Sequence, residues 1–464
     1  MQVKNVCCIG AGYVGGPTMA VIALKCPHIN VIVVDDNKEK IDSWNGNLDN
    51  LPVYEPGLKK IIKKVRGKNL FFSKNIDLAI TNSEIIFMAV NTPTKKEGIG
   101  AGMAANLVHV ERCAKRIARV SNKDKIVVEK STLPVRTAEK IKEILFSNNK
   151  KNNFEVLSNP EFLAEGTAIQ DLYKSDRVLI GGDSTINGEK AVRTLVEIYL
   201  NWIPREKILT TNVWSSELSK LASNAMLAQR ISSINSLSAL CQKSGADIGE
   251  VAKAIGMDHR IGPKFLKASV GFGGSCFKKD ILNLVYLSQY YGLDEVAEYW
   301  IQVIKINEYQ KRRFCTKIID SFNGKIINKK ITILGWAFKK NTNDSRESAS
   351  IYVAKNLLKN GAKINIYDPM VNNDLIFNDL MDSLKELEIN KDEFQKISKN
   401  FNIHNNHYDA LFNCDAIAIL TEWEEFKNYN WNKIIEKSEF KPVIFDGRNI
   451  LKEKKIKTKI NFIG

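Results

Sequence analysis

The stretch Gly271–Asp280, GFGGSCFKKD, has the residue types that nucleophilic chemistry needs. Cys276 follows a glycine-rich loop, whose bare backbone would let a ligand approach the sulfur. A helix that begins near Ser275 would lower the pKa of the thiol and favour the thiolate. Asp280 lies four residues further on and would share a helical face with the cysteine. A lone cysteine in a helix is usually a small apolar residue, but the glycines and the aspartate here favour a nucleophile.

Two further groups of polar residues are candidates for a site. Glu161 and Glu165 belong to the segment NPEFLAEG, which follows the strand-like run EVLS. Lys220 and Asn224 are four residues apart on a predicted helix and therefore share one face. The alternative for either pair is a solvated helical face, the commoner fate of lysine and asparagine.

A glycine-rich segment, GAGYVG, follows the strand-like run VCCI and begins a helical stretch. The pattern alone is a weak signal, but this context is typical of a dinucleotide-binding loop. Gly10 would allow the tight turn, Gly12 would let the backbone approach a pyrophosphate, and Gly15 would permit close helix–strand packing. The helix N-terminus would face the phosphates with unpaired N–H groups.

An acidic residue ends the next strand-like run, VIVV. Asp35 at this place would accept hydrogen bonds from a ribose 2′-hydroxyl and repel a 2′-phosphate, which favours NAD over NADP. Asp36 is the competing candidate, because either residue could end the strand while the other serves as a turn residue. Lys40 would soften the preference for NAD without reversing it.

Polar residues also follow two later strand-like runs: Val90–Thr94 (VNTPT) after IIFMA, and Lys130–Pro134 (KSTLP) after IVVE. Parallel sheets bind ligands beyond the carboxyl ends of their strands. Ordinary turn chemistry around the prolines is the alternative. Together with the glycine loop, the two segments indicate a binding site.

The sequence pattern predicts two α/β domains that would position these residues. Short apolar runs alternate with helical stretches in residues 1–212, which indicates a parallel sheet covered on both faces. Residues 213–322 lack such runs and have long helical periodicity. The alternation returns in residues 323–464 with ITILGWAF, INIYDP, AIAILTEW and VIFDGR. We therefore predict two Rossmann-like doubly wound domains joined by a central helical dimerisation domain with a long connecting helix.

The composition of the chain excludes several classes of function. The net charge of +16 comes from scattered lysines rather than a basic patch, so we predict no nucleic-acid partner. No apolar run spans a membrane, and the N-terminus enters a strand directly, so we expect a cytoplasmic protein. The eight cysteines form no CxxC pair and fit neither a zinc site nor a disulfide framework. The five histidines lie outside these motifs, so neither a metal site nor a histidine-dependent mechanism is expected.

Nine motifs, in order from about residue 3 to about residue 463, resemble the UDP-glucose/GDP-mannose dehydrogenase family, most closely its animal-type UDP-glucose members. They are GAGYVGG, VNTPT, EKSTLPVR, NPEFLAEG, SSELSKLASNA, KASVGFGGSCFKKD, LGWAFKKNTNDSRES, IYDP and IFDGR. The resemblance implies oxidation of UDP-glucose to UDP-glucuronate with two NAD and water, through a thiohemiacetal and a thioester on the cysteine. It also implies a dimer through the central domain, a hexamer, and feedback inhibition by UDP-xylose.

The resemblance implies roles position by position. Cys276 matches the nucleophile, and Lys220 and Asn224 match groups that stabilise charge on the substrate oxygen. Proton transfer and the hydrolytic water fall to Glu161, Asp280 and Thr132. The implied NAD contacts are Gly10, Gly12, Tyr13, Val14, Gly15, Asp35, Lys40, Val90, Asn91, Thr92, Pro93, Thr94, Ser131, Thr132, Glu165, Cys276 and Arg346. The implied substrate contacts are Glu161, Phe162, Leu163, Glu165, Lys220, Asn224, Arg260 (toward a neighbouring subunit), Lys267, Phe272, Gly273, Lys339 and Arg448.

Departures from the family pattern and rival functions remain. Trp336 replaces a smaller aromatic residue, and Asn341 and Asn343 replace an aspartate and a glycine, which puts the geometry near Lys339 and Arg346 in question. The nearest rival is another nucleotide-sugar 6-dehydrogenase, of the GDP-mannose or UDP-N-acetylmannosamine type. A catalytically silent nucleotide-sugar-binding protein is a rival from another class. The sequence leaves open which carboxylate is the base at each step.

Overall fold

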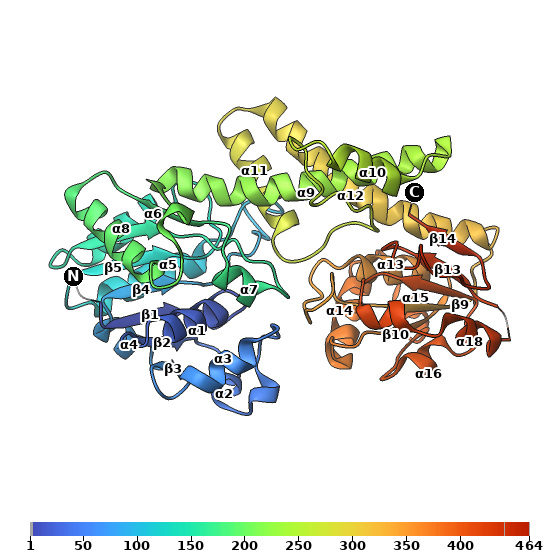
Figure 1. Ribbon diagram of the computed structural model, residues 1–464, viewed down its shortest axis with the longest axis horizontal. Coiled ribbons are helices and arrows are strands. Elements are labelled where there is room, and N and C mark those ends of the chain that lie inside the picture. The colour runs from blue at the N-terminus through green and yellow to red at the C-terminus, as the bar shows by residue number, and fades with distance from the viewer. Residues whose placement is uncertain (1–2, 440, 464) are drawn as a thin grey trace. The chain divides into compact units, whose positions relative to one another are not determined.

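The computed structural model describes residues 3–439 and 441–463, which form two compact units (Figure 1). The first unit runs to Ser223 and includes Leu282–Asp294. The second holds Asn224–Ile281 and continues from Glu295. The division falls inside the predicted helical segment 213–322, so this segment contributes to both units. The three-domain division stays a prediction.

The first unit is built on a doubly wound sheet with, among the described residues, eight strands in the order β3-β2-β1-β4-β5-β6-β7-β8. The first six strands have the 3-2-1-4-5-6 order of dinucleotide-binding folds. The strands are β1 (Asn5–Ile9), β2 (Asn30–Val34), β3 (Leu70–Ser73), β4 (Ile85–Met88), β5 (Lys125–Glu129), β6 (Phe154–Ser158), β7 (Val178–Gly182) and β8 (Ile208–Asn212).

Helices cover this sheet. They are α1 (Gly15–Lys25), α2 (Lys38–Asn45), α3 (Leu58–Val65), α4 (Ile76–Asn82), α5 (Val108–Val120), α6 (Thr137–Asn148), α7 (Ala168–Tyr173) and α8 (Ile186–Tyr199), with 3-10 turns η1 (Leu48–Asn50) and η2 (Arg205–Lys207). Alternate residues of β1 belong to opposite cores: Val6 and Cys8 to one, Cys7 and Ile9 to the other. Burial on both faces explains why the strand is a continuous apolar run.

The sheet departs from the predicted parallel arrangement at one pair, because β7 runs antiparallel to β6. Antiparallel neighbours need no crossover helix between them. The chain between these strands uses residues 159–167, before α7, for the loop that carries Glu161. The break in the parallel pattern therefore accompanies a candidate functional loop.

The central helices are α9 (Val213–Ser244), α10 (Ile248–Gly256), α11 (Phe277–Tyr290) and α12 (Asp294–Ser321). Neither Ser215 nor Ser216 caps α9, because the helix begins at Val213. The Asn212 side chain accepts a hydrogen bond from the Ser215 N–H at 2.8 Å, and Ser216 Oγ instead bonds Ser158 Oγ at 2.9 Å. Within residues 3–439 and 441–463, no helix is long and apolar enough to cross a membrane.

The second unit contains a parallel sheet whose described strands have the order β11-β10-β9-β12-β13-β14, again 3-2-1-4-5-6. The strands are β9 (Lys330–Leu334), β10 (Lys363–Tyr367), β11 (Phe401–Ile403), β12 (Ala416–Ile419), β13 (Val443–Asp446) and β14 (Ile460–Phe462). The helices are α13 (Ala349–Lys359), α14 (Asn373–Lys385), α15 (Lys391–Ile397), α16 (His407–Leu411), α17 (Glu424–Asn428) and α18 (Trp431–Glu436).

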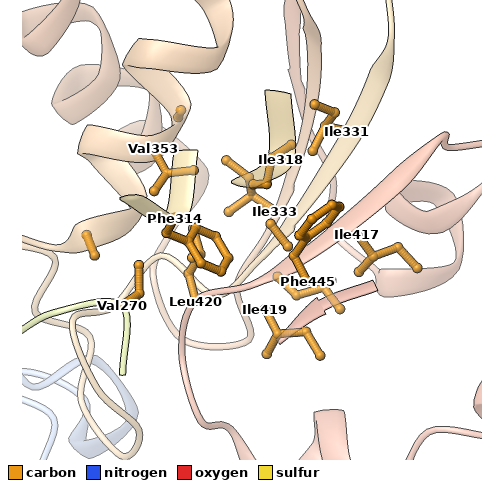
Figure 2. Close-up of a cluster of buried hydrophobic side chains, with 14 of the residues drawn as sticks. Val270, Phe314, Ile318, Ile331, Ile333, Val353, Ile417, Ile419, Leu420 and Phe445 are labelled. Carbon is orange, nitrogen blue, oxygen red and sulfur yellow. The ribbon is translucent and has the colours of Figure 1, made fainter. Parts of the chain in front are cut away.

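Helix α12 is anchored on this second sheet. Figure 2 shows Phe314 and Ile318 of α12 in one buried cluster with Ile333 of β9 and Phe445 of β13. Val270, just before the cysteine loop, belongs to the same cluster, and its N–H donates to the Gly447 carbonyl at 2.8 Å. The core of the second unit therefore fixes the start of the segment that carries Cys276. Each unit contains a Rossmann-like sheet with its helices, and the central helices lie between the two in the sequence. This arrangement confirms the predicted fold class.

Candidate functional site

The glycine loop after β1 has the predicted shape. Gly10 has a φ of +113°, and a Cβ there would lie 2.2 Å from the Ala89 carbonyl oxygen. A Cβ on Gly15 would lie 2.0 Å from the Gly10 oxygen, so both glycines are required by packing. A Cβ on Gly12, by contrast, would have no described atom within 4 Å, and no side chain caps α1 at Val14. The loop thus presents open backbone at the N-terminus of α1, which fits a pyrophosphate.

Asp35 faces this loop and Asp36 does not. The Asp35 carboxylate accepts hydrogen bonds from the Ala11 N–H at 2.9 Å and from Lys40 Nζ at 3.1 Å. Burial raises the pKa of Asp35, but hydrogen bonds from the Ala11 and Asn37 backbone and from Lys40 outweigh it and hold the pKa below its usual range. Asp36 is exposed and pairs with Arg116 at 3.2 Å. Asp35, rather than Asp36, therefore faces the glycine loop, and its contact with a ribose hydroxyl stays a prediction.

The loops after β4 and β5 are joined to each other, as expected for two strand ends at one sheet edge. Ser131 Oγ donates to the Val90 carbonyl at 2.7 Å, and Thr92 Oγ1 donates to the Thr132 carbonyl at 3.2 Å. The Pro93 carbonyl accepts from the Asn106 N–H at 2.7 Å, which fixes the VNTPT turn. These bonds hold the predicted cofactor residues of the two loops side by side.

A buried polar cluster lies beside these loops in the first unit. Lys220 Nζ lies 3.7 Å from Glu161 Oε1, and Thr132 Oγ1 donates to the same oxygen at 3.4 Å. Glu161 is 7% exposed and Lys220 4%. Glu161 Oε2 is buried and has no hydrogen-bond partner among the described residues. A carboxylate with one oxygen held and the other unsatisfied is suited to accept a proton or to orient a hydroxyl or a water.

Phe162 and Leu163 continue the Glu161 loop. Two cations lie over the Phe162 ring, the Arg177 guanidinium 3.8 Å and Lys220 Nζ 5.4 Å from its centroid. Leu163 packs against the core of the first unit. Glu55 closes the loop by accepting the Gly166 N–H at 2.7 Å, so the half-buried Glu165 is held on a fixed turn. The predicted substrate residues of this segment therefore share one rigid loop.

In the second unit, Cys276 sits immediately before the first residue of α11, close to the helix start predicted near Ser275. Its carbonyl accepts the Asp280 N–H at 2.8 Å, and the Ser275 hydroxyl lies 3.5 Å from its sulfur. Cys276 is partly exposed, whereas the seven other cysteines are buried. Burial raises the pKa of Cys26 to about 11 and of Cys113 to about 12, so such thiols stay protonated at neutral pH. Exposure and position distinguish Cys276 from the other cysteines, and its role as nucleophile stays a prediction.

The glycine-rich loop before Cys276 is held from two sides of the second unit. Asn307 of α12 accepts the Phe272 N–H at 2.8 Å and donates to the Phe272 carbonyl at 3.1 Å. A Cβ on Gly273 would lie 2.5 Å from the Glu347 carbonyl oxygen, and the Gly274 N–H donates to the Arg346 carbonyl at 2.8 Å. The glycines are therefore needed because the loop packs on backbone. Asn307 was not predicted, since nothing in the local sequence of α12 marks it.

Asp280 and Asn224 form a second buried pair. Asn224 Nδ2 donates to Asp280 Oδ2 at 2.6 Å, and Lys279 Nζ lies 3.3 Å from Asp280 Oδ1. Asp280 is 1% exposed. Asn224 follows Lys220 by one turn of α9, as predicted from the spacing. The predicted solvated-face alternative is wrong for Lys220 and Asn224, because both are buried.

The remaining predicted substrate residues lie in the second unit with varied surroundings. Arg448 donates to the carbonyls of Leu420 and Phe338 at 2.7 and 2.8 Å, which places it against the loop that carries Lys339. Arg346 pairs with Asp344. Lys267 is exposed, and Arg260 is exposed and paired with Asp258. Their roles toward substrate or a neighbouring subunit stay predictions.

The departures at Trp336 and Asn341 are accommodated by the fold. The Trp336 indole N–H donates to Asp379 of α14 at 3.1 Å. Asn341 adopts a left-handed conformation with a φ of +64°, which asparagine tolerates better than most residues. Ser345 Oγ also bonds Asp379, so this one carboxylate holds both ends of the loop that carries Lys339.

Comparisons with known proteins agree with this construction. Three domain descriptions of the UDP-glucose/GDP-mannose dehydrogenase family match the chain: the NAD binding domain at residues 4–203, the central domain at 214–309 and the UDP binding domain at 332–453. UDP-glucose 6-dehydrogenase of Mus musculus is 57% identical over 452 residues, covering 97% of this chain and 90% of the relative. UDP-glucose 6-dehydrogenase 4 of Arabidopsis thaliana is 56% identical over 464 residues, covering 99% and 96%.

Solved structures give the same result. A UDP-glucose dehydrogenase from the archaeon Pyrobaculum islandicum has a TM-score of 0.83 at 28% identity, covering 100% of this chain and 98% of that one. A UDP-D-ManNAc dehydrogenase from Pyrococcus horikoshii has a TM-score of 0.80 at 23% identity, which shows a shared fold. With matching descriptions over all three segments and relatives that cover nearly the whole chain, this chain belongs to the UDP-glucose/GDP-mannose dehydrogenase family.

Proposed function

We propose that this chain oxidises UDP-glucose to UDP-glucuronate, with NAD as the oxidant, through a thioester on Cys276. The observation that carries the proposal is the placement of Cys276: it is partly exposed behind a packed glycine loop at the start of α11, with the Asp280–Asn224 pair one turn further on. Relatives at 56–57% identity over nearly the whole chain are UDP-glucose 6-dehydrogenases.

The first oxidation needs a base for the proton of the C6 hydroxyl. Glu161 and Asp280 are two buried carboxyl groups that we propose for this role, each held by a neighbour: Glu161 by Lys220, and Asp280 by Asn224. Loss of the hydroxyl proton and of a hydride from C6 converts the alcohol into an aldehyde. The Lys220 ammonium and the Asn224 amide are the donors suited to stabilise the charge that develops on the oxygen.

The sulfur then keeps the aldehyde on the protein. The Cys276 thiolate adds to the aldehyde carbon, and the carbonyl oxygen takes up a proton, which gives a thiohemiacetal. Loss of a second hydride from that carbon and of the hydroxyl proton gives a thioester. Water, oriented by Thr132 or activated by a carboxylate, adds to the thioester carbonyl, the C–S bond breaks, and the thiolate leaves. One site thus completes a four-electron oxidation.

The described residues fit NAD. The glycine loop presents open backbone at the N-terminus of α1, and Asp35 lies beside that loop with carboxylate lone pairs beyond the three in use. Residues of the glycine loop, Asp35, Lys40, the VNTPT turn, Ser131, Thr132, Glu165 and Arg346 would hold it. When bound, NAD would supply the hydride acceptor for each of the two oxidations.

Removing the Asp35 carboxylate should weaken the preference for NAD. In Asp35→Ser, we expect the ratio of kcat/KM for NADP to that for NAD to rise by about tenfold or more, equivalent to about 1.4 kcal/mol. The reason is that the carboxylate repels a 2′-phosphate, whereas Lys40, released from Asp35, would attract it. Steady-state kinetics with both cofactors measure the ratio.

Asp36→Ser is the matched control, because Asp36 is acidic, adjacent and exposed. We expect its cofactor ratio to equal that of the native chain. A ratio that changes in Asp36→Ser and not in Asp35→Ser would reverse the assignment of the ribose ligand.

The substrate is tested by competition among nucleotide sugars. Lys267, Phe272, Gly273, Lys339 and Arg448 are the proposed contacts in the second unit. The native chain should form an acid from UDP-glucose, identified by mass, and turn over GDP-mannose and UDP-N-acetylmannosamine at least about 100-fold less efficiently, about 2.7 kcal/mol. Faster turnover of either rival would keep the cysteine chemistry and reassign the substrate.

Assembly, regulation and location complete the proposal. The chain would form dimers through the central helices and hexamers from these, with Arg260 reaching a neighbouring subunit's substrate. Light scattering that finds a stable monomer would contradict this.

UDP-xylose would inhibit in competition with UDP-glucose, and an unchanged rate at saturating UDP-xylose with limiting substrate would reject that. Eight cysteines in the thiol form fit a cytoplasmic location, which fractionation of the source cell would test.

A further inference from the structure

Lys130 is a buried cation to which neither motif nor mechanism assigns a role. It follows β5 directly and is 3% exposed. Its Nζ donates to Asn159 Oδ1 at 3.2 Å and lies 3.4 Å from the Tyr199 hydroxyl oxygen. The Tyr199 hydroxyl donates to the same Asn159 oxygen at 2.6 Å. Burying an ammonium costs free energy unless neighbouring groups compensate for its charge. The charge of Lys130 therefore requires groups nearby that compensate for it.

The groups that compensate for the charge of Lys130 include the turn that carries Glu161. Asn159 lies two residues before Glu161, and its own amide donates to the Leu179 carbonyl at 2.8 Å, so it links β5, β7 and the loop. The charged and titratable groups that act on Lys130 are Glu161, Lys220, Cys8 and Tyr199. Glu161 therefore has Lys220 at 3.7 Å and also interacts electrostatically with the buried Lys130.

We propose that Lys130 is a positioning residue of the oxidation: its ammonium anchors Asn159 and, together with Lys220, keeps the Glu161 side chain oriented toward the substrate. This inference rests on the proposed function of the site. Lys130 does not have to touch the sugar, because it acts through Asn159 and through its charge. Removal of that charge should affect turnover more than substrate binding.

The first test is Lys130→Met, which keeps an unbranched side chain of similar length without the charge. We expect kcat with UDP-glucose to fall about 10- to 100-fold, with little change in the KM for UDP-glucose. Lys125→Met is the matched control, because Lys125 is also buried, lies at the other end of β5 and donates only to the carbonyls of Ile80, Thr81 and Ser83 in the described structure. Its kcat per folded chain should equal the native value.

The second test uses pH and does not depend on absolute rates. Burial, with a smaller contribution from Lys220, lowers the pKa of Lys130 to about 8, while Glu161 opposes the shift. The native ammonium is therefore charged below about pH 8 and neutral above it. In Lys130→Arg the charge persists through this range. The ratio of native kcat to Lys130→Arg kcat should therefore fall between pH 7 and pH 9.

The outcomes separate this inference from the function on which it rests. A native chain that turns over UDP-glucose, with a kcat for Lys130→Met within twofold of native and a flat native-to-Lys130→Arg ratio, would overturn the role of Lys130 alone. Loss of activity in Lys130→Met and Lys125→Met in equal proportion would reduce Lys130 to a structural residue. A folded native chain that oxidises no nucleotide sugar would overturn the proposed function as well.

Discussion

A Cys276→Ser variant is expected to form UDP-glucuronate at least about 10³-fold more slowly than the native chain, because a serine hydroxyl is not ionised at neutral pH and cannot replace the thiolate. The proposed first oxidation does not use the sulfur, so a single turnover should still release a hydride equivalent and leave the aldehyde. Stopped-flow absorbance of NADH and mass analysis of the sugar product measure the two steps separately.

Cys26→Ser is the matched control for this substitution. Cys26 is buried, burial raises its pKa to about 11, and its sulfur already lies 3.7 Å from the Ile198 carbonyl oxygen, which a serine hydroxyl can also contact. We expect its rate of acid formation to be unchanged. A Cys276→Ser variant as active as Cys26→Ser would remove the sulfur from the mechanism.

A Lys220→Met variant is expected to lower kcat by about 10²- to 10³-fold, the effect of removing one preorganised donor at a developing oxyanion. Lys220 is buried and lies 3.7 Å from Glu161, so the variant also leaves that carboxylate without its cation. The expected loss is therefore larger than for Lys130→Met. Steady-state kinetics together with thermal unfolding distinguish lost chemistry from lost folding.

Lys243→Met controls for a lysine-to-methionine change on the same helix, because Lys243 is exposed near the end of α9. It should keep the native kcat. If Lys220→Met retained more than a tenth of the native kcat while remaining folded, Lys220 would be a structural cation rather than a group that stabilises the transition state.

The sequence best predicted those parts of the site whose structure follows from residue spacing within one short segment. The glycine spacing predicted the loop after β1, and the Gly10 φ and the close contacts of Gly10 and Gly15 confirm its shape. Helical spacing placed Lys220 and Asn224 one turn apart on α9, and the helix start near Ser275 was within two residues of α11. Strand ends identified the Val90 and Thr132 loops because parallel strands meet at one edge.

The sequence could not predict contacts between distant segments. The sequence did not show which of Asp35 and Asp36 contacts the Ala11 N–H of the glycine loop, and the structure shows that it is Asp35. Asn307 on α12 holds the cysteine loop, although its surrounding sequence is that of an ordinary amphipathic helix. Lys130 was part of a recognised segment, but only its contact with Asn159 marks it as buried and paired. A lysine directly after a fully buried strand is the signal that would have drawn attention to it.

A buried pair of carboxyl groups was also absent from the predictions. Glu217 of α9 accepts the N–H groups of Arg136 and Ala138 at 2.8 and 2.9 Å, at the start of α6. Burial raises the pKa of Glu217 to about 7, and burial together with the Glu217 charge raises the pKa of Glu129 well above its usual range. Two acids so far apart in the sequence meet only because β5, α6 and α9 pack together, which no local pattern shows.

The most direct test of the thioester route is the number of NADH molecules formed per UDP-glucose consumed by the native chain. The reaction is run to completion with limiting UDP-glucose and excess NAD, and the sugar product is identified by mass. Two NADH per sugar with UDP-glucuronate as the product is the predicted result, since each of the two oxidations at C6 releases one hydride. One NADH per sugar, with the aldehyde as the product, would contradict the proposed role of Cys276.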